Sequence, residues 1–174
     1  MLKLINSKLK IKIDPKSDDE YKKIVSDLIN NPVVKSMEQY MQHGNVSCLE
    51  HSIYVSYNSY LICKRLGLNY RAAARGGLLH DFFLYDWHTS KPQNGLRGFI
   101  HPFIALENAN KYFELSDMEK DIIEKHMWPL TLKLPKYKES FIVSFVDKYY
   151  AFMESIKVNN REFIKSILSQ LESI

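Results

Sequence analysis

The sequence predicts an all-α protein, a helical bundle that forms a single domain over residues 1–174. Two observations favour this class: helix-capping signals recur along the chain, and the apolar residues between them follow helical spacing. A third is that no internal repeat, low-complexity tract or linker rich in Pro, Gly or Ser divides the chain. With 45% hydrophobic residues, the chain can bury one substantial core.

Helix starts are marked by a serine followed three positions later by a glutamate, at Ser17, Ser47 and Ser116. In such a capping box, the serine oxygen and the glutamate side chain satisfy free backbone amides of the first turn. Gly67 suits a helix end, and Pro129 prevents a helix from continuing past it. We expect helices over residues 18–30, 32–42, 47–66, 70–82, 102–113, 117–127, 138–155 and 161–171.

Three segments depart from the helical pattern. Residues 8–14 alternate lysine with leucine or isoleucine, which predicts one short N-terminal strand. The longest irregular stretch, residues 85–100, contains Pro92 and the turn-forming pair Asn94-Gly95. Because loops of this length in compact domains are often functional, this stretch is a candidate functional segment. A second break covers residues 129–137.

Charge and composition limit the partners. The formal net charge is +4, and the lysines form no dense basic stripe, so we expect no specific nucleic-acid partner. The mild positive charge is compatible with a phosphorylated small-molecule substrate. No segment approaches the roughly 20 apolar residues that span a bilayer, and the N-terminus lacks a signal-peptide core, so we expect no membrane association.

The two cysteines, Cys48 and Cys63, lie fifteen positions apart on one predicted helix. At about 1.5 Å of rise per residue they stand roughly 22 Å apart, which is too far for a disulfide bond. Reduced thiols and a cytoplasmic location are the corresponding expectation. Oligomeric state has no signature in the sequence.

Several histidines and aspartates occur where solvation does not explain them. His51 shares a helical stripe with Cys48, Val55, Ile62 and Leu66, so it points inward. Taken alone, this position is more typical of a hydrogen-bonded core histidine than of a metal ligand.

The pair His80-Asp81 follows two leucines and precedes two phenylalanines. An ionised carboxylate in such surroundings is costly unless it is paired, hydrogen-bonded or bound to a cation. Asp147 poses the same problem in a helix that is apolar nearly all round, where its partner is Lys148, a buried tyrosine or a metal shared with distant histidines. His101 and His126 stand at the rims of predicted core helices.

In chain order these residues form the series His, His-Asp, His, His, Asp: His51, His80, Asp81, His101, His126 and Asp147. The series resembles the HD-domain superfamily of metal-dependent phosphohydrolases, in the longer version associated with two metals. The resemblance covers about residues 44–154, including the phrase Leu78-Leu79-His80-Asp81 and the terminal Asp147-Lys148. It implies a helical bundle of the HD-domain type.

The resemblance implies that His51, His80, Asp81 and Asp147 hold the first metal. In the two-metal version, Asp81 also bridges to a second metal completed by His101 and His126. Independently of the family, imidazole and carboxylate donors suit one or two divalent transition metals (Fe, Mn, Zn, Co or Ni) better than Mg or Ca. The implied reaction is cleavage of a phosphomonoester or phosphodiester, nucleotides included, by a metal-activated water.

Further roles follow only from residue type and position in the chain. Asp81, Lys148 and His88 are the candidate catalytic residues, the last two as proton donors to the leaving oxygen. The candidate substrate-binding cations, which match phosphate oxygens, are Arg75, Lys91, Arg97 and Lys125. For each of these four, the more common role is that of an ordinary surface cation.

Two other functions stay open. Some relatives resembling inositol oxygenase use the same ligand set with two irons to activate oxygen. A non-catalytic metal-binding or regulatory module is the third interpretation, although such a module has no chemical need for all six groups. The Gly-Tyr-Pro motif of the cyclic-di-GMP phosphodiesterase branch is absent after His126, so that branch is not expected.

Overall fold

The structure, a computed structural model, describes residues 15–43, 46–84 and 97–155. Their elements are α2 (Pro15–Ile29), α3 (Pro32–Lys35), the 3-10 helix η1 (Ser36–Gln39), β1 (Met41–His43), β2 (Val46–Ser47), α4 (Cys48–Arg65), α5 (Tyr70–Leu79), α6 (Arg97–Tyr112), α7 (Asp117–Lys125) and α8 (Lys138–Ser155). The predicted all-α class is confirmed, since the described strands form only one short antiparallel pair. In these ranges no helix combines the length and the hydrophobicity that a membrane crossing requires.

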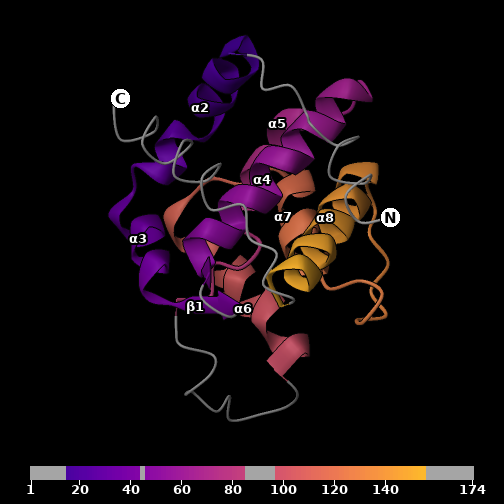
Figure 1. Cartoon of the computed structure of the whole chain (residues 1–174). Coiled ribbons are helices and arrows are strands. Elements are labelled where there is room, and N and C mark those ends of the chain that lie inside the picture. The colour runs from indigo at the N-terminus through magenta and orange to yellow at the C-terminus, as the bar shows by residue number, and fades with distance from the viewer. Residues whose placement is uncertain (1–14, 44–45, 85–96, 156–174) are drawn as a thin grey trace.

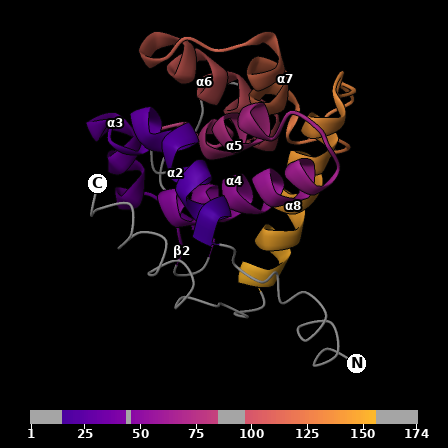
Figure 2. The same cartoon turned by 90° about the horizontal axis from the view of Figure 1, so that it is seen from above.

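Helix α4 lies at the centre of the bundle and packs against α5 and α8 (Figure 1). In turn, α5 contacts α2 and α7, and α6 packs mainly on α7. Seen from above, α4 and α5 occupy the middle, with α6 and α7 on one side and α8 at one end (Figure 2). The chain therefore surrounds α4 and α5 with helices that are distant from them in sequence.

The capping boxes predicted at Ser47 and Ser116 are present. Ser47 caps the start of α4: its Oγ accepts from the Glu50 backbone N–H at 3.1 Å, and the Glu50 carboxylate accepts from the Ser47 N–H at 3.1 Å. Ser116 and Glu119 start α7 in the same way. The start predicted near Asp18 is wrong, because α2 already begins at Pro15.

The predicted helix over residues 32–42 is wrong in its second half. Asn31 caps α3 by accepting from the Val33 N–H, but the helix ends at Lys35 and η1 ends at Gln39. Tyr40 is extended, and its carbonyl accepts a hydrogen bond from the Cys48 N–H at 2.7 Å. Pairing with the start of α4 therefore replaces helix continuation, and Met41–His43 becomes β1.

The helix predicted over residues 102–113 is present, but its predicted start at Pro102 is wrong. Helix α6 begins at Arg97, and Pro102 lies inside it. Proline there removes one backbone hydrogen bond near the helix start, a cost that packing on α7 offsets. The predicted irregular stretch thus ends earlier than residue 100; its part at residues 85–96, the strand predicted at 8–14 and the helix predicted at 161–171 lie outside the described residues.

Two glycines let α5 approach its neighbours closely. A Cβ on Gly76 would lie 2.8 Å from Ile122 Cγ2 of α7, and a Cβ on Gly77 would lie 3.0 Å from the Ser56 Cα of α4. Neither distance is compatible with ordinary packing. The glycine pair therefore brings the end of α5, which leads into His80, against both α4 and α7.

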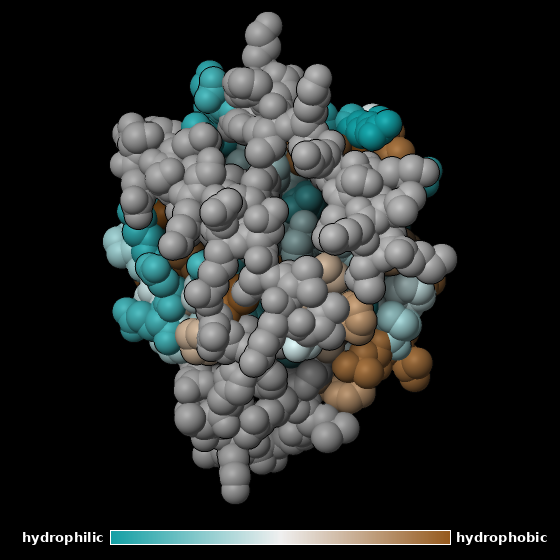
Figure 3. Space-filling view, viewed as in Figure 1, coloured by the Kyte–Doolittle hydropathy of each residue, from teal (hydrophilic) through white to brown (hydrophobic). Residues whose placement is uncertain are grey.

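The connection between α7 and α8 is irregular, as predicted for residues 129–137. Leu130, Leu132 and Leu134 of this connection are exposed. Figure 3 shows hydrophobic side chains gathered at the lower right of the molecule, where Figure 1 draws this connection. The main hydrophobic core lies around α4, away from these exposed leucines, and includes Cys48. Cys63 is buried in a second core cluster, and neither cysteine forms a disulfide bond.

Candidate metal centre

The six residues of the predicted series lie on or next to five helices, α4 to α8, and meet in one cluster. His51 lies on α4, His101 on α6 and Asp147 on α8, while His80 and His126 are the C-terminal caps of α5 and α7. The predicted continuation of α5 to Phe82 is wrong, and the early end at Leu79 lets Asp81 leave the helix. The buried members are His51, His80, Asp81, His126 and Asp147, whereas 17% of the His101 side chain is exposed.

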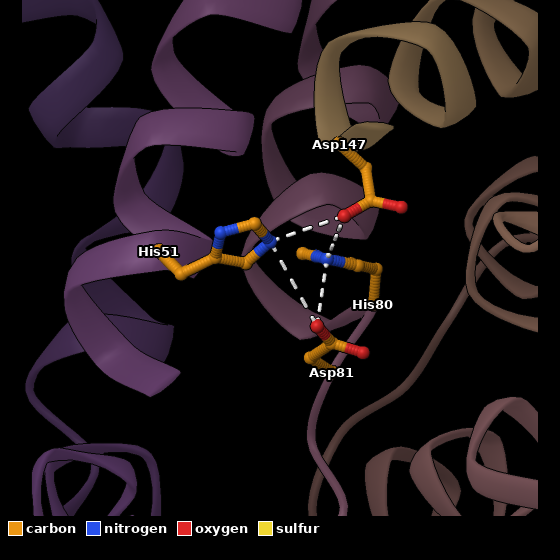
Figure 4. Close-up of side chains that lie close together, drawn as sticks. All are labelled: His51, His80, Asp81 and Asp147. Atoms are coloured by element: carbon orange, nitrogen blue, oxygen red, sulfur yellow. Dashed lines mark hydrogen bonds and ion pairs between the residues drawn. The ribbon is translucent and has the colours of Figure 1, made fainter. Parts of the chain in front are cut away.

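We call His51, His80, Asp81 and Asp147 the four-residue group; each offers one ligand atom, and these atoms lie within 4.8 Å of one another. His51 Nε2 is 3.1 Å from Asp147 Oδ1 and 3.9 Å from Asp81 Oδ2. His80 Nε2 is 3.5 Å and 3.1 Å from the same two oxygens. Figure 4 shows the two ring nitrogens and the two carboxylate oxygens converging on a common point.

Asp81, His101 and His126 form what we call the three-residue group, and their ligand atoms also lie within 4.8 Å of one another. The Nε2 atoms of His101 and His126 are each 3.4 Å from Asp81 Oδ1 and 2.9 Å from each other. The other oxygen of Asp81, Oδ2, faces the four-residue group. One carboxylate therefore stands between the two groups.

Helix ends orient two of the histidines. His80 Nδ1 lies 2.8 Å from the Gly77 carbonyl, and His126 Nδ1 lies 2.9 Å from the Ile123 carbonyl. The last carbonyls of a helix lack partners within it and can only accept, so each Nδ1 carries the proton. Each Nε2 is consequently directed toward the cluster as a lone-pair donor when the ring is neutral.

Two residues missed in the sequence support the cluster. The Glu154 carboxylate lies 3.0–3.1 Å from His51 Nδ1, and the Gln42 side-chain Nε2 donates to Asp81 Oδ2 at 2.6 Å. Glu154 could have been found, because it follows Asp147 by seven residues and therefore shares its helix face. Gln42 carried no such signal, since its position depends on the unpredicted strand β1.

The donor set and its surroundings fit a bound cation. His80 Nε2 and Asp81 Oδ1 are buried without a hydrogen-bond partner, which is costly in a metal-free site. Burial alone would lower the pKa of His51, but the carboxylates of Asp147 and Glu154 outweigh it and raise that pKa to about 10. Burial also opposes the charge of Asp147, yet His51 and His80 hold its pKa well below its ordinary value. The cluster therefore attracts positive charge.

Lys148 lies beside both groups. Its Nζ donates to the His126 carbonyl at 2.6 Å and is 3.6 Å from Asp147 Oδ2, and 37% of the side chain is exposed. Burial lowers the pKa of Lys148, although the neighbouring carboxylate of Asp147 opposes this shift. The structure thus brings this candidate catalytic residue to the cluster, whereas His88 lies outside the described residues.

The four candidate phosphate-binding cations are not equally placed. Arg75 forms ion pairs with Asp27 at 2.6 Å and Glu119 at 2.7 Å. Lys125 pairs with Asp121 at 2.5 Å. The Arg75 pairs connect α5 to α2 and α7, and the Lys125 pair lies within α7, so a substrate would have to compete with protein carboxylates for either cation. Lys91 and the Arg97 side chain lie outside the described part of the chain, and substrate binding by any of the four stays a prediction.

Comparisons with known proteins agree with the cluster. The model of the family described as "HD domain" matches residues 48–151, a range that contains all six residues of the two groups. The chain is also 28% identical over 88 residues to the Bacillus subtilis (strain 168) protein named "Putative phosphohydrolase YueE". That match covers 49% of this chain and 47% of the relative, so the chain spans about half of the relative's length. No solved structure matches the chain with significance.

The resemblance expected from the series His51 to Asp147 is therefore confirmed by an independent match over more than half of the chain. The bundle, the buried His/Asp cluster and the family match agree with one another. This chain belongs to the HD-domain family.

Proposed function

We propose that the protein is a metal-dependent phosphohydrolase that cleaves a phosphomonoester or phosphodiester, with nucleotides among the candidate substrates. Membership in the HD-domain family supports a metal-dependent enzyme, and a curated relative carries phosphohydrolase in its name. The single observation that carries the proposal is the position of Asp81, whose two oxygens face different histidine groups.

The four-residue group would hold one divalent ion, and the three-residue group would hold a second through the shared Asp81. Nitrogen and carboxylate donors together favour Fe, Mn, Zn, Co or Ni. When bound, such ions lower the pKa of a water molecule and neutralise charge on a phosphoryl oxygen. The contribution of the protein is then to hold the ligands rigid, to admit the substrate on one side and to supply a proton.

The solvent exposure of the cluster side chains indicates the side from which a substrate would enter. His51, His80 and Asp81 are closed off from solvent, whereas His101 and Lys148 are partly exposed. A phosphoester therefore approaches along α6 and α8. The Lys148 ammonium, fixed by the His126 carbonyl, is placed to pair with the anionic substrate and to give one proton to the departing alkoxide oxygen.

The first experiment is elemental analysis of protein purified without added metal, followed by hydrolysis assays. Substrates are p-nitrophenyl phosphate, its bis ester and a set of phosphorylated metabolites, each with manganese, iron, nickel or cobalt. Asp81→Asn preserves the shape of the side chain and should lose bound metal and turnover. Asp19→Asn, a surface control on α2 whose partner is Lys22, should keep both.

Three results would overturn the proposal. The protein could take up no divalent metal, Asp81→Asn could retain metal and turnover, or iron-loaded protein could consume oxygen with an organic substrate while hydrolysing none of the phosphoesters. The last result would favour the di-iron oxygenase alternative over hydrolysis.

A further inference from the structure

His51 differs from His80 and His126 in what holds its second ring nitrogen. The Nδ1 atoms of His80 and His126 face neutral backbone carbonyls. His51 Nδ1 faces a carboxylate, with Glu154 Oε2 at 3.0 Å and Oε1 at 3.1 Å. The four-residue group therefore receives a third negative charge from behind one of its ligands.

Helix α8 holds His51 at both ring nitrogens. Asp147 Oδ1 lies 3.1 Å from Nε2, and Glu154, seven residues later, faces Nδ1. Stacking of Tyr54 on Tyr150, with ring centroids 5.1 Å apart, packs α4 against α8 beside this contact. The orientation of the His51 ring is thus set by one helix acting on another.

The contact with His51 is the main described interaction of the Glu154 carboxylate. Its side chain is buried, and within the described ranges the His51 ring is the only basic group at ion-pair distance. A buried carboxylate is costly without compensation, so the burial of Glu154 depends on a ring that carries a proton on Nδ1. A carboxylate can only accept, which leaves Nε2 of the neutral ring as the lone pair directed at the cluster.

We propose that Glu154 is a positioning residue that fixes the tautomer and orientation of His51 and makes the four-residue group the tighter of the two metal positions. The inference rests on the proposed metal-dependent function. Outer carboxylates behind ligating histidines typically contribute about 10–100-fold in metal affinity. The three-residue group has one carboxylate, and its His126 is backed by a neutral carbonyl, so its metal should bind more weakly.

The test measures metal affinity rather than turnover. Metal-free wild-type protein, Glu154→Gln and Glu154→Ala are titrated with Co²⁺ and Zn²⁺ in the presence of a competing chelator. We expect two binding steps in the wild type, and the tighter step should weaken by about 10–100-fold in Glu154→Gln and by more in Glu154→Ala. Glu139→Gln is the matched control, because Glu139 is also buried on α8 but accepts from the distant Asn69 N–H.

A spectroscopic measurement separates positioning from mere packing. In Zn²⁺-loaded protein labelled with ¹⁵N-histidine, the Nδ1–H proton of His51 should give a downfield signal protected from exchange. The signal should shift in Glu154→Gln and lose its protection in Glu154→Ala, while Glu139→Gln leaves it in place. Glu154→Gln keeps the side-chain volume and carries the test if Glu154→Ala does not fold.

The outcomes distinguish this inference from the function on which it rests. If the wild type binds metal but both affinity steps and the His51 signal are unchanged in Glu154→Gln, the inference is overturned and the metal-dependent function stands. If the wild type binds no divalent metal, both are overturned.

Discussion

The four-residue group and the three-residue group share Asp81 but differ in charge, burial and support. The four-residue group contains two carboxylates, and Glu154 adds a third charge behind His51. The three-residue group contains one carboxylate, and its His101 is partly exposed. Under the proposed function, the first group would retain a cation and the second would meet the substrate.

The difference has its origin in packing. The four-residue group is carried by α4, the end of α5 and α8, and the central helix α4 packs closely against both α5 and α8. The three-residue group depends on α6, which packs mainly on α7 at the side of the bundle. A ligand on a peripheral helix is positioned by fewer neighbours, so its metal should exchange more readily.

The largest effects on metal content should come from two single variants, each of which removes one histidine from a different group. His51→Ala should abolish metal binding at the four-residue group and reduce turnover to background, because it removes one of the four ligands. It also leaves Glu154 buried without its partner. His101→Ala should leave one metal per chain instead of two. Elemental analysis measures the metal content of both variants, and unfolding curves confirm that they fold. Equal metal loss in the two variants would contradict the proposal that the four-residue group binds its metal more tightly.

Lys148 contacts both groups and tests whether they act on one substrate. Lys148→Met should lower kcat by about 100-fold or more, the typical contribution of a proton donor, with the metal content unchanged. If Lys148 only binds the substrate anion, KM should rise while kcat is retained. Steady-state kinetics with substrates of different leaving-group pKa distinguish the two, since a poor leaving group should suffer most from loss of a proton donor.

Gly77 tests the packing that supports the four-residue group. Gly77→Ala should destabilise the protein by about 1–3 kcal/mol, because the new Cβ would lie 3.0 Å from the Ser56 backbone, and it should weaken metal binding by displacing the carbonyl that orients His80. The control is Gly67→Ala, at a φ of +67° with open space around it. Urea unfolding and Co²⁺ titration should show lost stability in both variants but weaker metal binding only in Gly77→Ala.

The last prediction concerns Asp121, which lies outside both groups and joins α7 to the start of α8. Burial would raise its pKa, but hydrogen bonds from Lys125, Ser140 and the Lys136 N–H outweigh this and lower it below the ordinary value of 3.8. Because the folded-state pKa is lowered, the stabilisation is present above pH 3.8 and is lost as pH falls through the folded-state value.

Asp121→Asn should therefore cost about 1–3 kcal/mol at neutral pH, and the difference from the wild type should shrink on acidification. Urea unfolding from pH 7 down to about pH 3 measures it. A difference that stays constant with pH would show that the carboxylate charge is not what stabilises the α7–α8 contact.

Much of the fold was predictable because its signals are local. The capping boxes at Ser47 and Ser116 act within one turn, and both are present as expected. The errors occurred where distant partners decide the backbone: Tyr40 pairs with Cys48 instead of continuing a helix, and Pro102 is carried inside α6.

The candidate site divides in the same way. The sequence by itself indicated the candidates: His51, His80-Asp81 and Asp147 are polar groups in apolar helical positions that require compensation, and the resemblance to the HD-domain superfamily joined them with His101 and His126 into one series. Only the tertiary structure decided how they are grouped, that Asp81 faces both sets of histidines, and that Glu154 and Gln42 stand behind them. Helical periodicity fixes which face a side chain occupies, whereas the partner that it meets depends on how separate helices pack.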